Sequence, residues 1–492
     1  MEKPRILFTH SYFLRLDPKQ LQSNKPYAPL MTIQAAAVMR EAGYPVTLFD
    51  VMFAHGPDDI KTVLEKEQPE ILVIFDDGFN YLTKMCLTNM REAAWTMAGI
   101  ARKKGCTVIA CSSDATDHYE DYLRNDTDYV LLGEGEETLL ELITALETGN
   151  PIQHIMGLAF IRNDQINHSP KRPVMKDLDT LPLPAWDLVD FEPYRDRWHK
   201  HWGYFSVNIA TTRGCPYKCN WCAKPIYGNS YKMRSPGHVI REIEVLKRIT
   251  YFDHIWFCDD IFGLKRSWVV EFSEEVQRRG LQFKYKIQSR ADLLVKEQYI
   301  EALHASGCNE AWMGVESGSQ KILDAMEKGI TIDQVYSATQ KLKEKGILPC
   351  FFIQFGYPGE TADDIRMTID LICDLMPSDI GISVSYPLPG TKFYETVKDE
   401  LAIKANWTDS DDLDLMFRHT YSSQFYKKLH RFVHQQFRKK RALDHIRKWQ
   451  NGADPWNKKN WKRALSYFYY APSAFFAKRQ LKAVDFEAGS SL

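Results

Sequence analysis

Short apolar runs alternate with amphipathic helical patterns along the first 150 or so residues. The runs that read as strands lie at residues 5–9, 46–50, 71–75, 107–111 and 129–132. Helical patterns fall between them, at residues 31–42, 58–67, 90–104 and 137–146. Such alternation predicts an α/β domain, a Rossmann-like parallel sheet with helices on both faces.

The alternation then repeats six times in the middle of the chain. Strands are predicted at residues 205–210, 254–258, 283–288, 310–315, 349–355 and 380–384, with helices at 239–249, 268–279, 333–345 and 363–375. Six βα units predict an open, incomplete (β/α)6 barrel with its active site at the carboxyl ends of the strands. We therefore expect a Rossmann-like domain at 1–165, a linker at 166–200, a partial TIM barrel at 201–400 and a helical C-terminal region at 401–492. Residues 170–194 are too proline-rich for regular structure.

Composition narrows the class of protein. Hydrophobic residues make up 44% and charged residues 26%, which is typical of a globular chain. The start lacks a basic leader followed by an apolar stretch, and no window approaches about 18 consecutive apolar residues, so we expect a cytoplasmic protein. Ten cysteines, three of them within residues 215–222, indicate reduced thiols and a metal site rather than a disulfide framework.

The net charge of -1 conceals a basic C-terminal region. Residues 424–482 carry 16 Lys and Arg against two acidic residues, interleaved with aromatic side chains. Basic and aromatic residues together suit an anionic membrane surface, and they also suit RNA. The third interpretation is a helical lid whose rings pack on the barrel and whose cations are solvated. We favour the lid first, membrane contact second and nucleic acid last.

Three cysteines follow the first predicted barrel strand with the spacing Cys-x3-Cys-x2-Cys. Cys215, Cys219 and Cys222 lie in the sequence GCPYKCNWC, on a loop at the expected active edge. Three thiolates can hold three irons of a 4Fe-4S cubane and leave the fourth iron open for an outside ligand. The alternatives are buried inert thiols or a zinc site completed elsewhere, for example by His238. Zinc sites usually contain two Cys or Cys/His couples, and no second couple follows here.

Polar residues also follow the predicted strands of the first domain, where ligands bind in open parallel sheets. Glycines in the last group allow backbone to approach a ligand closely. The candidate binding residues at this edge are Asp76, Asp77, Ser112, Ser113, Gly133, Glu134, Gly135 and Glu136.

These motifs carry a resemblance to a known family. Residues 200–400 resemble the radical S-adenosylmethionine (SAM) superfamily, through the cysteine motif. The whole chain resembles the cobalamin-binding branch, which includes carbon methylases and the anaerobic magnesium-protoporphyrin monomethyl ester cyclase. The matches to this branch are residues 133–136, 316–319 and 387–391.

The resemblance implies roles for individual residues. It implies a 4Fe-4S cluster on the three cysteines and cobalamin between the first sheet and the barrel mouth. The chain lacks the Asp-x-His-x-x-Gly motif that supplies a cobalt-ligating histidine in many cobalamin proteins. For SAM, the resemblance implies contacts of Asp259 and Asp260 with the amino group, Arg290 with the carboxylate, Glu316 with the ribose, and a further contact of Gln354.

The implied activity is cobalamin-dependent radical chemistry on an unactivated carbon, most simply methylation. Oxidative cyclisation or hydroxylation is the alternative within the branch. A tRNA methylthiotransferase would need a second cluster on Cys86, Cys106 and Cys111, but Cys106 and Cys111 lie at two ends of one strand and should face opposite sides of the sheet. The expected partners are a small-molecule substrate, lipid-like or tetrapyrrole, a reducing protein such as flavodoxin or ferredoxin, and the inner membrane surface.

Overall fold

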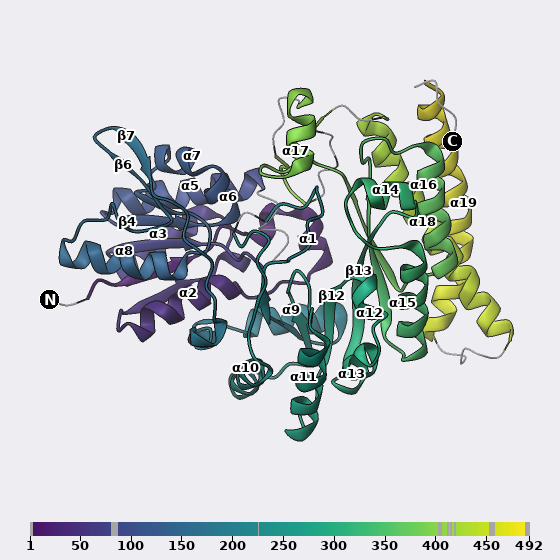
Figure 1. Cartoon of the computed structure of the whole chain (residues 1–492), viewed down its shortest axis with the longest axis horizontal. Coiled ribbons are helices and arrows are strands. Elements are labelled where there is room, and N and C mark those ends of the chain that lie inside the picture. The colour runs from purple at the N-terminus through teal and green to yellow at the C-terminus, as the bar shows by residue number, and fades with distance from the viewer. Residues whose placement is uncertain are drawn as a thin grey trace.

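The computed structural model describes residues 3–79, 87–224, 226–401, 406–410, 413, 416–417, 420–451 and 458–487. Two sheets lie side by side, and a pair of long helices covers the far end of the second (Figure 1). The carboxyl ends of both sets of parallel strands meet in the middle of the molecule. This arrangement places the predicted binding edge of the first domain against the predicted barrel mouth.

The first sheet has the strand order β2-β1-β3-β4-β5-β6-β7. Its first five strands are parallel, as predicted, and β5, β6 and β7 are antiparallel neighbours. The β6–β7 hairpin was not predicted, because its outer residues are polar and exposed and lack an apolar run. The strands are β1 (Ile6–Thr9), β2 (Val46–Phe49), β3 (Ile71–Phe75), β4 (Thr107–Cys111), β5 (Tyr129–Leu131), β6 (Leu158–Arg162) and β7 (Gln165–His168).

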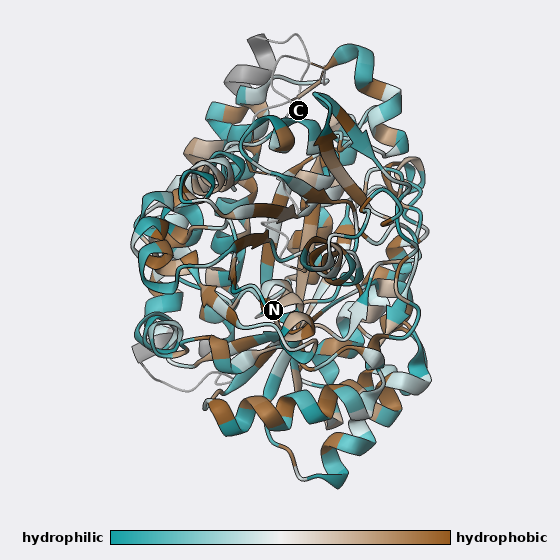
Figure 2. Ribbon diagram, turned by 90° about the vertical axis from the view of Figure 1, so that its left-hand side faces the viewer, coloured by the Kyte–Doolittle hydropathy of each residue, from teal (hydrophilic) through white to brown (hydrophobic). Residues whose placement is uncertain are grey.

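Helices cover both faces of this sheet. Phe8 packs with α2 and α8 on one face, whereas Leu7, the next residue, packs with α3 and α5 on the other. The strands are mostly brown in Figure 2, and the surrounding helices alternate between brown and teal, as amphipathic helices do. The helices are α1 (Pro18–Ser23), α2 (Leu30–Glu41), α3 (Ile60–Glu67), α5 (Thr88–Lys103), α6 (Ser113–Asp117), α7 (Tyr119–Arg124) and α8 (Glu136–Thr148).

The segment predicted as a linker contains more regular structure than its prolines suggest. Short 3-10 turns lie at Leu178–Thr180 and Trp186–Leu188, and α9 spans Glu192–Trp202. Trp186 is buried and donates a hydrogen bond of 3.0 Å to Glu242 of the barrel. The segment therefore packs between the two sheets instead of merely connecting them.

The second sheet is the predicted open barrel. Six parallel strands follow one another in chain order, from β8 at one edge to β15 at the other. The strands are β8 (Ser206–Ile209), β11 (His254–Phe257), β12 (Lys284–Ser289), β13 (Cys308–Glu316), β14 (Leu348–Phe355) and β15 (Asp379–Val384); β9 (Thr212–Arg213) and β10 (Lys232–Met233) form a separate small ladder. The helices are α10 (Pro236–Ile249), α11 (Arg266–Arg278), α12 (Ala291–Leu294), α13 (Tyr299–Ala305), α14 (Gln320–Ala325), α15 (Ile332–Glu344), α16 (Ala362–Leu375) and α17 (Lys392–Val397).

The two faces of the barrel sheet differ in polarity. Residues such as Ile255, Tyr285 and Phe351 are buried under the helices. The alternate positions point to the concave face and include Lys286 and Gln354. Alternation along the strands thus separates an apolar packing face from a mixed inner face.

Two long helices follow the barrel, α18 (Ser423–Gln450) and α19 (Lys458–Glu487). Helix α18 contacts α16 and the edge strand β15, and its buried face includes Phe425, Leu429 and Val433. The open edge of the half-barrel is therefore covered, and α19 packs on the outer side of α18 (Figure 1). Among the described helices, none combines the length and apolarity needed to cross a membrane.

Candidate functional site at the cysteine loop

The three cysteines lie on one loop between β9 and β10, at the carboxyl end of the barrel. The loop begins with Gly214, whose φ is +80° and where a Cβ would lie 2.4 Å from the carbonyl oxygen of Ser230. A side chain there would both strain the backbone and collide with it. Cys215, Cys219 and Cys222 are each half-buried.

Residues from several barrel loops hold the cysteine loop in place. Asn220 donates from its backbone N–H to Met326 O at 3.1 Å and from Nδ2 to Ala325 O at 2.7 Å. The Tyr357 hydroxyl donates to Asn220 Oδ1 at 2.9 Å. Lys224 Nζ donates to the carbonyl oxygen of Cys215 at 3.1 Å. The loop is therefore held by its own backbone, by the end of α14 and by the turn after β14.

Charged side chains of both signs flank the thiols. Burial raises the pKa of Cys222 to about 12, and the nearby Asp260 carboxylate acts in the same direction. Arg290 Nη1 lies 3.9 Å from Cys219 Sγ, and its guanidinium stacks 3.6 Å from the centre of the Tyr217 ring. Metal binding at this loop must displace thiol protons.

A single-ion site gains no support from this geometry. Among the described residues, no group of three or more His, Cys, Asp or Glu side chains could hold one metal ion. His238, the candidate fourth zinc ligand, instead contacts Asp179 at 3.1 Å and Arg234 at 3.2 Å. Three donors around a multi-iron cluster need not converge on one point, so the donor set fits a cluster better than one zinc ion.

The two aspartates that follow β11 have different surroundings. Asp259 is fully buried and accepts hydrogen bonds from the N–H groups of Thr211 and Thr212, at 2.7 and 2.8 Å, and from the Thr211 hydroxyl at 2.6 Å. Burial raises the pKa of Asp259 to about 6. Asp259 thus serves to hold the turn after β8. Asp260 is half-buried and faces the thiols.

Arg290 and Glu316 belong to one buried network at the ends of β12 and β13. Glu316 has a φ of +62°, a conformation that is strained for a side-chain-bearing residue. Its carboxylate forms an ion pair of 2.6 Å with Lys328. Arg290 donates to the carbonyl oxygens of Lys328 and Gly329 at 2.8 and 3.2 Å. Lys328 therefore links two predicted SAM contacts, and no motif in the sequence marked it for this role.

Some polar atoms on the concave face have no protein partner. Gln354 Oε1, Asn208 Oδ1 and Ser385 Oγ are buried and lack a hydrogen-bond partner within the part of the chain that the structure describes. Strand alternation places Asn208 and Gln354 on the concave face, and Ser385 follows β15 directly. Buried polar atoms without partners are rare in native proteins, so these three are available to a ligand in the barrel.

The polar residues at the edge of the first sheet are largely occupied. Asp76 accepts from the N–H and the hydroxyl of Ser11, at 2.6 and 2.9 Å. Asp77 accepts from the N–H of Phe79 at 2.9 Å. Ser112 caps α6 by accepting from Ala115 N at 2.7 Å, and Ser113 is buried as the first residue of that helix. Most of the predicted cobalamin contacts therefore also maintain the fold of this edge.

The residues at 133–136 face the barrel. Glu134 and Glu136 form ion pairs with Arg213, at 2.5 and 2.6 Å. Gly135 allows close packing, because a Cβ there would lie 2.5 Å from Cys111 Sγ, and the Gly133 N–H donates to Thr116 at 3.1 Å. Sequence reasoning missed Arg213, although its position two residues before Cys215 could have identified it.

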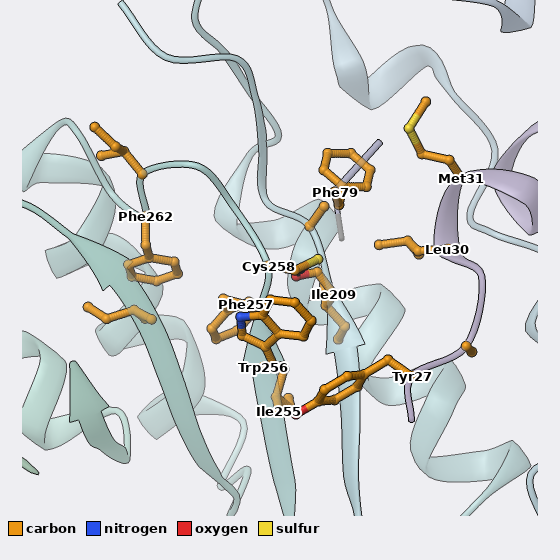
Figure 3. Packing of buried hydrophobic residues seen from close by; sticks show 14 of the residues in the cluster. Tyr27, Leu30, Met31, Phe79, Ile209, Ile255, Trp256, Phe257, Cys258 and Phe262 are labelled. Carbon is orange, nitrogen blue, oxygen red and sulfur yellow. Dashed lines mark hydrogen bonds between the residues drawn. The ribbon is translucent and has the colours of Figure 1, made fainter. Parts of the chain in front are cut away.

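A small cavity of about 20 Å³ lies where the first sheet, the predicted linker and the barrel meet. Leu30 and Phe79 line it from the first domain, and Ala210 and Arg213 line it from the barrel. Figure 3 shows Leu30 turned toward Ile209, and the Tyr27 ring lies 4.7 Å from that of Trp256. A cavity of this volume holds about one water molecule, so a corrinoid would require these side chains to move apart.

The second cluster of a methylthiotransferase has no support in this structure. Cys111 belongs to the core on one face of the first sheet and Cys106 to the core on the other. The prediction that they face opposite ways is confirmed. Cys86 lies outside the described residues.

Comparison with known proteins identifies the class. Residues 209–372 match the family model described as the radical SAM superfamily. The chain therefore contains a radical SAM domain and is an enzyme. An uncharacterized methyltransferase of Pyrococcus horikoshii is 28% identical over 379 residues, which span 75% of this chain and 79% of that protein. The anaerobic magnesium-protoporphyrin IX monomethyl ester cyclase of Rubrivivax gelatinosus is 27% identical over 286 residues, 56% of this chain and 50% of the cyclase.

Solved structures define the fold of the whole chain. The cobalamin-dependent radical SAM enzyme OxsB, solved with aqua-cobalamin bound, superposes with a TM-score of 0.74 at 16% identity over 97% of this chain and 72% of OxsB. The radical SAM methyltransferase TsrM of Kitasatospora setae, solved with cobalamin and a [4Fe-4S] cluster, gives 0.67 at 20% identity over 81% of this chain and 75% of TsrM. The predicted Rossmann-like domain, half-barrel and helical C-terminal region are confirmed as the fold of cobalamin-dependent radical SAM enzymes.

Proposed function

We propose that this chain is a cobalamin-dependent radical SAM enzyme that methylates an unactivated carbon. The observation that carries the proposal is the placement of three half-buried thiols at the carboxyl end of a half-barrel whose inner face holds unpartnered polar atoms. Three sulfur donors leave one iron of a cubane open. When bound, the cluster would supply one electron to the sulfonium of one SAM molecule, breaking it into methionine and a 5'-deoxyadenosyl radical, and cobalamin would carry a methyl group taken from another SAM molecule.

The chain's own residues have distinct tasks in this proposal. Cys215, Cys219 and Cys222 hold the cluster, and Asp260 is positioned beside them for the ammonium group of SAM. Gln354 and Ser385 offer hydrogen-bonding atoms to the rest of the cosubstrate. Arg290, Glu316 and Asp259 act mainly by fixing the loops, because each is already bound by protein groups. A reducing protein such as flavodoxin or ferredoxin supplies the electron.

Cobalamin would lie between the first sheet and the barrel mouth. The fold supports this placement, although the small cavity between Leu30, Phe79 and Ala210 would have to widen to admit a corrinoid. The residues left to contact a corrinoid are apolar side chains and backbone, since Asp76, Glu134 and Glu136 are engaged elsewhere. No histidine ligand for cobalt is proposed.

The inner face of the barrel favours an apolar, ring-bearing substrate. Trp312 and Phe352 lie with ring centres 4.7 Å apart and planes 31° apart. They pack over Gly381, and Phe352 keeps 36% of its surface exposed. An exposed aromatic pair inside a concave sheet is a platform for flat or apolar molecules, which suits a lipid-like or tetrapyrrole substrate.

Oxidative cyclisation is the second candidate, favoured by the similarity to the anaerobic cyclase. The two reactions differ in the fate of the SAM methyl group. With SAM labelled by ¹³C in that group, methylation transfers the label to the product. Cyclisation leaves all of the label in methionine or in unreacted SAM.

Anaerobic purification tests the class of cofactor. Roughly four irons per chain and a corrinoid spectrum would support the proposal. About eight irons without corrinoid would indicate a methylthiotransferase, and zinc alone would leave only a scaffold. Cys308→Ala is the matched control for the cluster variants, because Cys308 is buried at the opposite end of the barrel.

The outer helix α19 provides a second proposal, peripheral contact with the cytoplasmic membrane surface. Trp461, Leu465, Phe468 and Phe475 recur at helical spacing and are 42%, 49%, 72% and 58% exposed. The opposite side of the helix is buried on α18, including Ala474, Ala477 and Leu481. Basic residues flank the exposed stripe at Lys462, Arg463, Lys478 and Arg479.

This face suits the interface of an anionic bilayer, where rings enter the headgroup region and cations meet phosphate. Co-sedimentation with vesicles of phosphatidylglycerol should exceed that with phosphatidylcholine and weaken with salt. The triple variant Phe468→Ser/Phe475→Ser/Phe476→Ser should lose binding. Met367→Ser, at a residue 53% exposed on α16, is the control. Equal sedimentation with and without anionic vesicles would refute the contact.

A further inference from the structure

A buried group of three charged residues joins the first domain to the cysteine loop. Arg213 Nη1 lies 2.5 Å from Glu134 Oε1, and Arg213 Nη2 lies 2.6 Å from Glu136 Oε1. The three side chains are 5%, 6% and 1% exposed. Glu134 Oε2 also accepts from the backbone N–H of Met175 at 2.5 Å. Three separate segments of the chain therefore meet at this charged group.

The position of Arg213 gives this contact a consequence for the cysteines. Arg213 ends β9, Gly214 follows, and Cys215 is the first thiol. Described contacts between the loop after the cysteines and the first domain include the Tyr227 hydroxyl 3.3 Å from Met31 Sδ and the Tyr227 ring 6.2 Å from that of Phe79. Such contacts are weakly directional, whereas a two-carboxylate clamp on one guanidinium fixes both distance and orientation.

The charge of the group supports a positional role. Two carboxylates share one cation, and Glu136 Oε2 has no hydrogen-bond partner among the described residues. Burying such a group costs desolvation that its attraction only partly offsets, so it contributes little net stability. Removing the cation alone would leave two buried carboxylates unpaired, which is strongly unfavourable.

We propose that Arg213 is a positioning residue that sets the cysteine loop against the first domain through Glu134 and Glu136. The consequence for catalysis rests on the proposed function, because it matters only if the loop carries the cluster. In that case the clamp fixes the distance between the cluster and whatever the first sheet binds. The group is thus a mechanical connection between two sites on different sheets.

Hydrogen exchange of the protein without cluster or cofactors tests the clamp independently of activity. In Arg213→Met, exchange should accelerate roughly tenfold or more in two segments, residues 129–139 and 206–218, because an unpaired buried charge opens both sides of the contact. The triple variant Arg213→Met/Glu134→Gln/Glu136→Gln should return both segments toward wild-type rates. Arg172→Met is the control, since Arg172 also pairs with two glutamates, Glu137 and Glu141, but within the first domain.

Reconstitution with iron and sulfide gives a second readout. Arg213→Met should retain the iron content of wild type, because the thiols belong to the barrel's own loop, but the electron paramagnetic resonance spectrum of its reduced cluster with SAM should become a mixture of line shapes. Wild-type exchange rates in Arg213→Met would overturn the proposal. So would a triple variant that exchanges as fast as the single one. A wild type that binds no cluster would instead end the proposed function, and the exchange data would still report on the clamp.

Discussion

Asp76 and Asp259 occupy equivalent places in the two parallel sheets. Each aspartate follows a buried strand, β3 or β11, and each accepts hydrogen bonds from the turn after the neighbouring strand, at Ser11 or at Thr211 and Thr212. Burial raises the pKa of both carboxyls. The same device, a carboxylate closing the adjacent turn, is therefore used once in each sheet.

The two edges differ in the polar groups that remain. At the first sheet, Ser112 and Glu134 are bound within the protein, and Glu136 is paired with Arg213 through one oxygen while its other oxygen has no partner among the described residues. At the barrel, Gln354 Oε1 and Ser385 Oγ are buried without partners among the described residues. A polar residue at a strand end can thus either hold a turn or be available to bind a ligand. The barrel edge, with the thiols beside it, is the edge prepared for polar ligands, and the first sheet offers mostly apolar surface.

The largest effect should come from removing a thiol. Cys219→Ala should lose most of the reconstituted iron and reduce 5'-deoxyadenosine formation to background, because two sulfur donors cannot retain the cubane. Iron analysis and chromatography of the products measure both. Cys308→Ala should keep both properties. Undiminished SAM cleavage in Cys219→Ala would show that the barrel edge is not the reactive one.

The paired aspartates give the next largest effects. Asp259→Ala should destabilise the protein by roughly 3–5 kcal/mol and Asp76→Ala by roughly 2–4 kcal/mol, since each leaves buried donors unsatisfied. Urea unfolding measures both losses. Asp259→Ala should also reduce SAM cleavage, because Thr211 and Thr212 lead directly into the cysteine loop.

The Asp76→Ala variant separates the two sheets. SAM cleavage in this variant should stay near wild type, while the corrinoid retained after purification should fall. Similar loss of SAM cleavage in both variants would mean that the two edges act as one site. Loss of SAM cleavage only in Asp76→Ala would mean that the edge of the first sheet, and not the barrel edge, binds SAM.

Most of the architecture could be predicted from apolar periodicity. All five parallel strands of the first sheet and all six of the barrel were predicted within one or two residues of their positions, because each is a short apolar run between helical patterns. The hairpin of β6 and β7 was not predicted, because an exposed antiparallel edge does not need an apolar run. Because the predicted linker is rich in proline, neither α9 nor the burial of Trp186 was predicted.

The site was predictable only where spacing encodes chemistry. The cysteine spacing places three thiols on one loop without reference to the rest of the fold. The partners of Asp259 and Glu316 could not be predicted, because Thr211 and Lys328 reach them only through tertiary contacts. One signal was available: hydroxyl residues at the end of the neighbouring strand, Ser11 and Thr211, mark an aspartate that closes a turn.

Glu360 should make stability depend on pH at the barrel edge. Burial raises the pKa of Glu360 to about 8, above its ordinary value of 4.5, although its Oε2 accepts from Gly356 N at 2.6 Å. The folded protein therefore retains a proton that the unfolded chain releases, and stability falls as pH rises from about 4.5 to 8. Glu360→Gln should lack this component and gain about 2–4 kcal/mol on wild type between pH 5 and pH 8.5. The free energy of unfolding of both proteins can be measured by urea titration at each pH. The same dependence on pH in wild type and Glu360→Gln would contradict the assignment.

Replacing Gln354 should change stability least. It should also distinguish most clearly between polar residues that hold a turn and polar residues that bind a ligand. A group that holds a turn costs stability when removed, whereas a group that awaits a ligand costs affinity. Gln354→Leu removes a buried oxygen that has no partner, so the free energy of unfolding should change by less than about 1 kcal/mol. The Kd for SAM, measured by calorimetry on the reconstituted enzyme, should rise roughly tenfold, the loss of one hydrogen bond in a dry site. Ser385→Ala should follow the same pattern more weakly, and a Gln354 variant that loses stability but not affinity would place Gln354 with the aspartates that close turns.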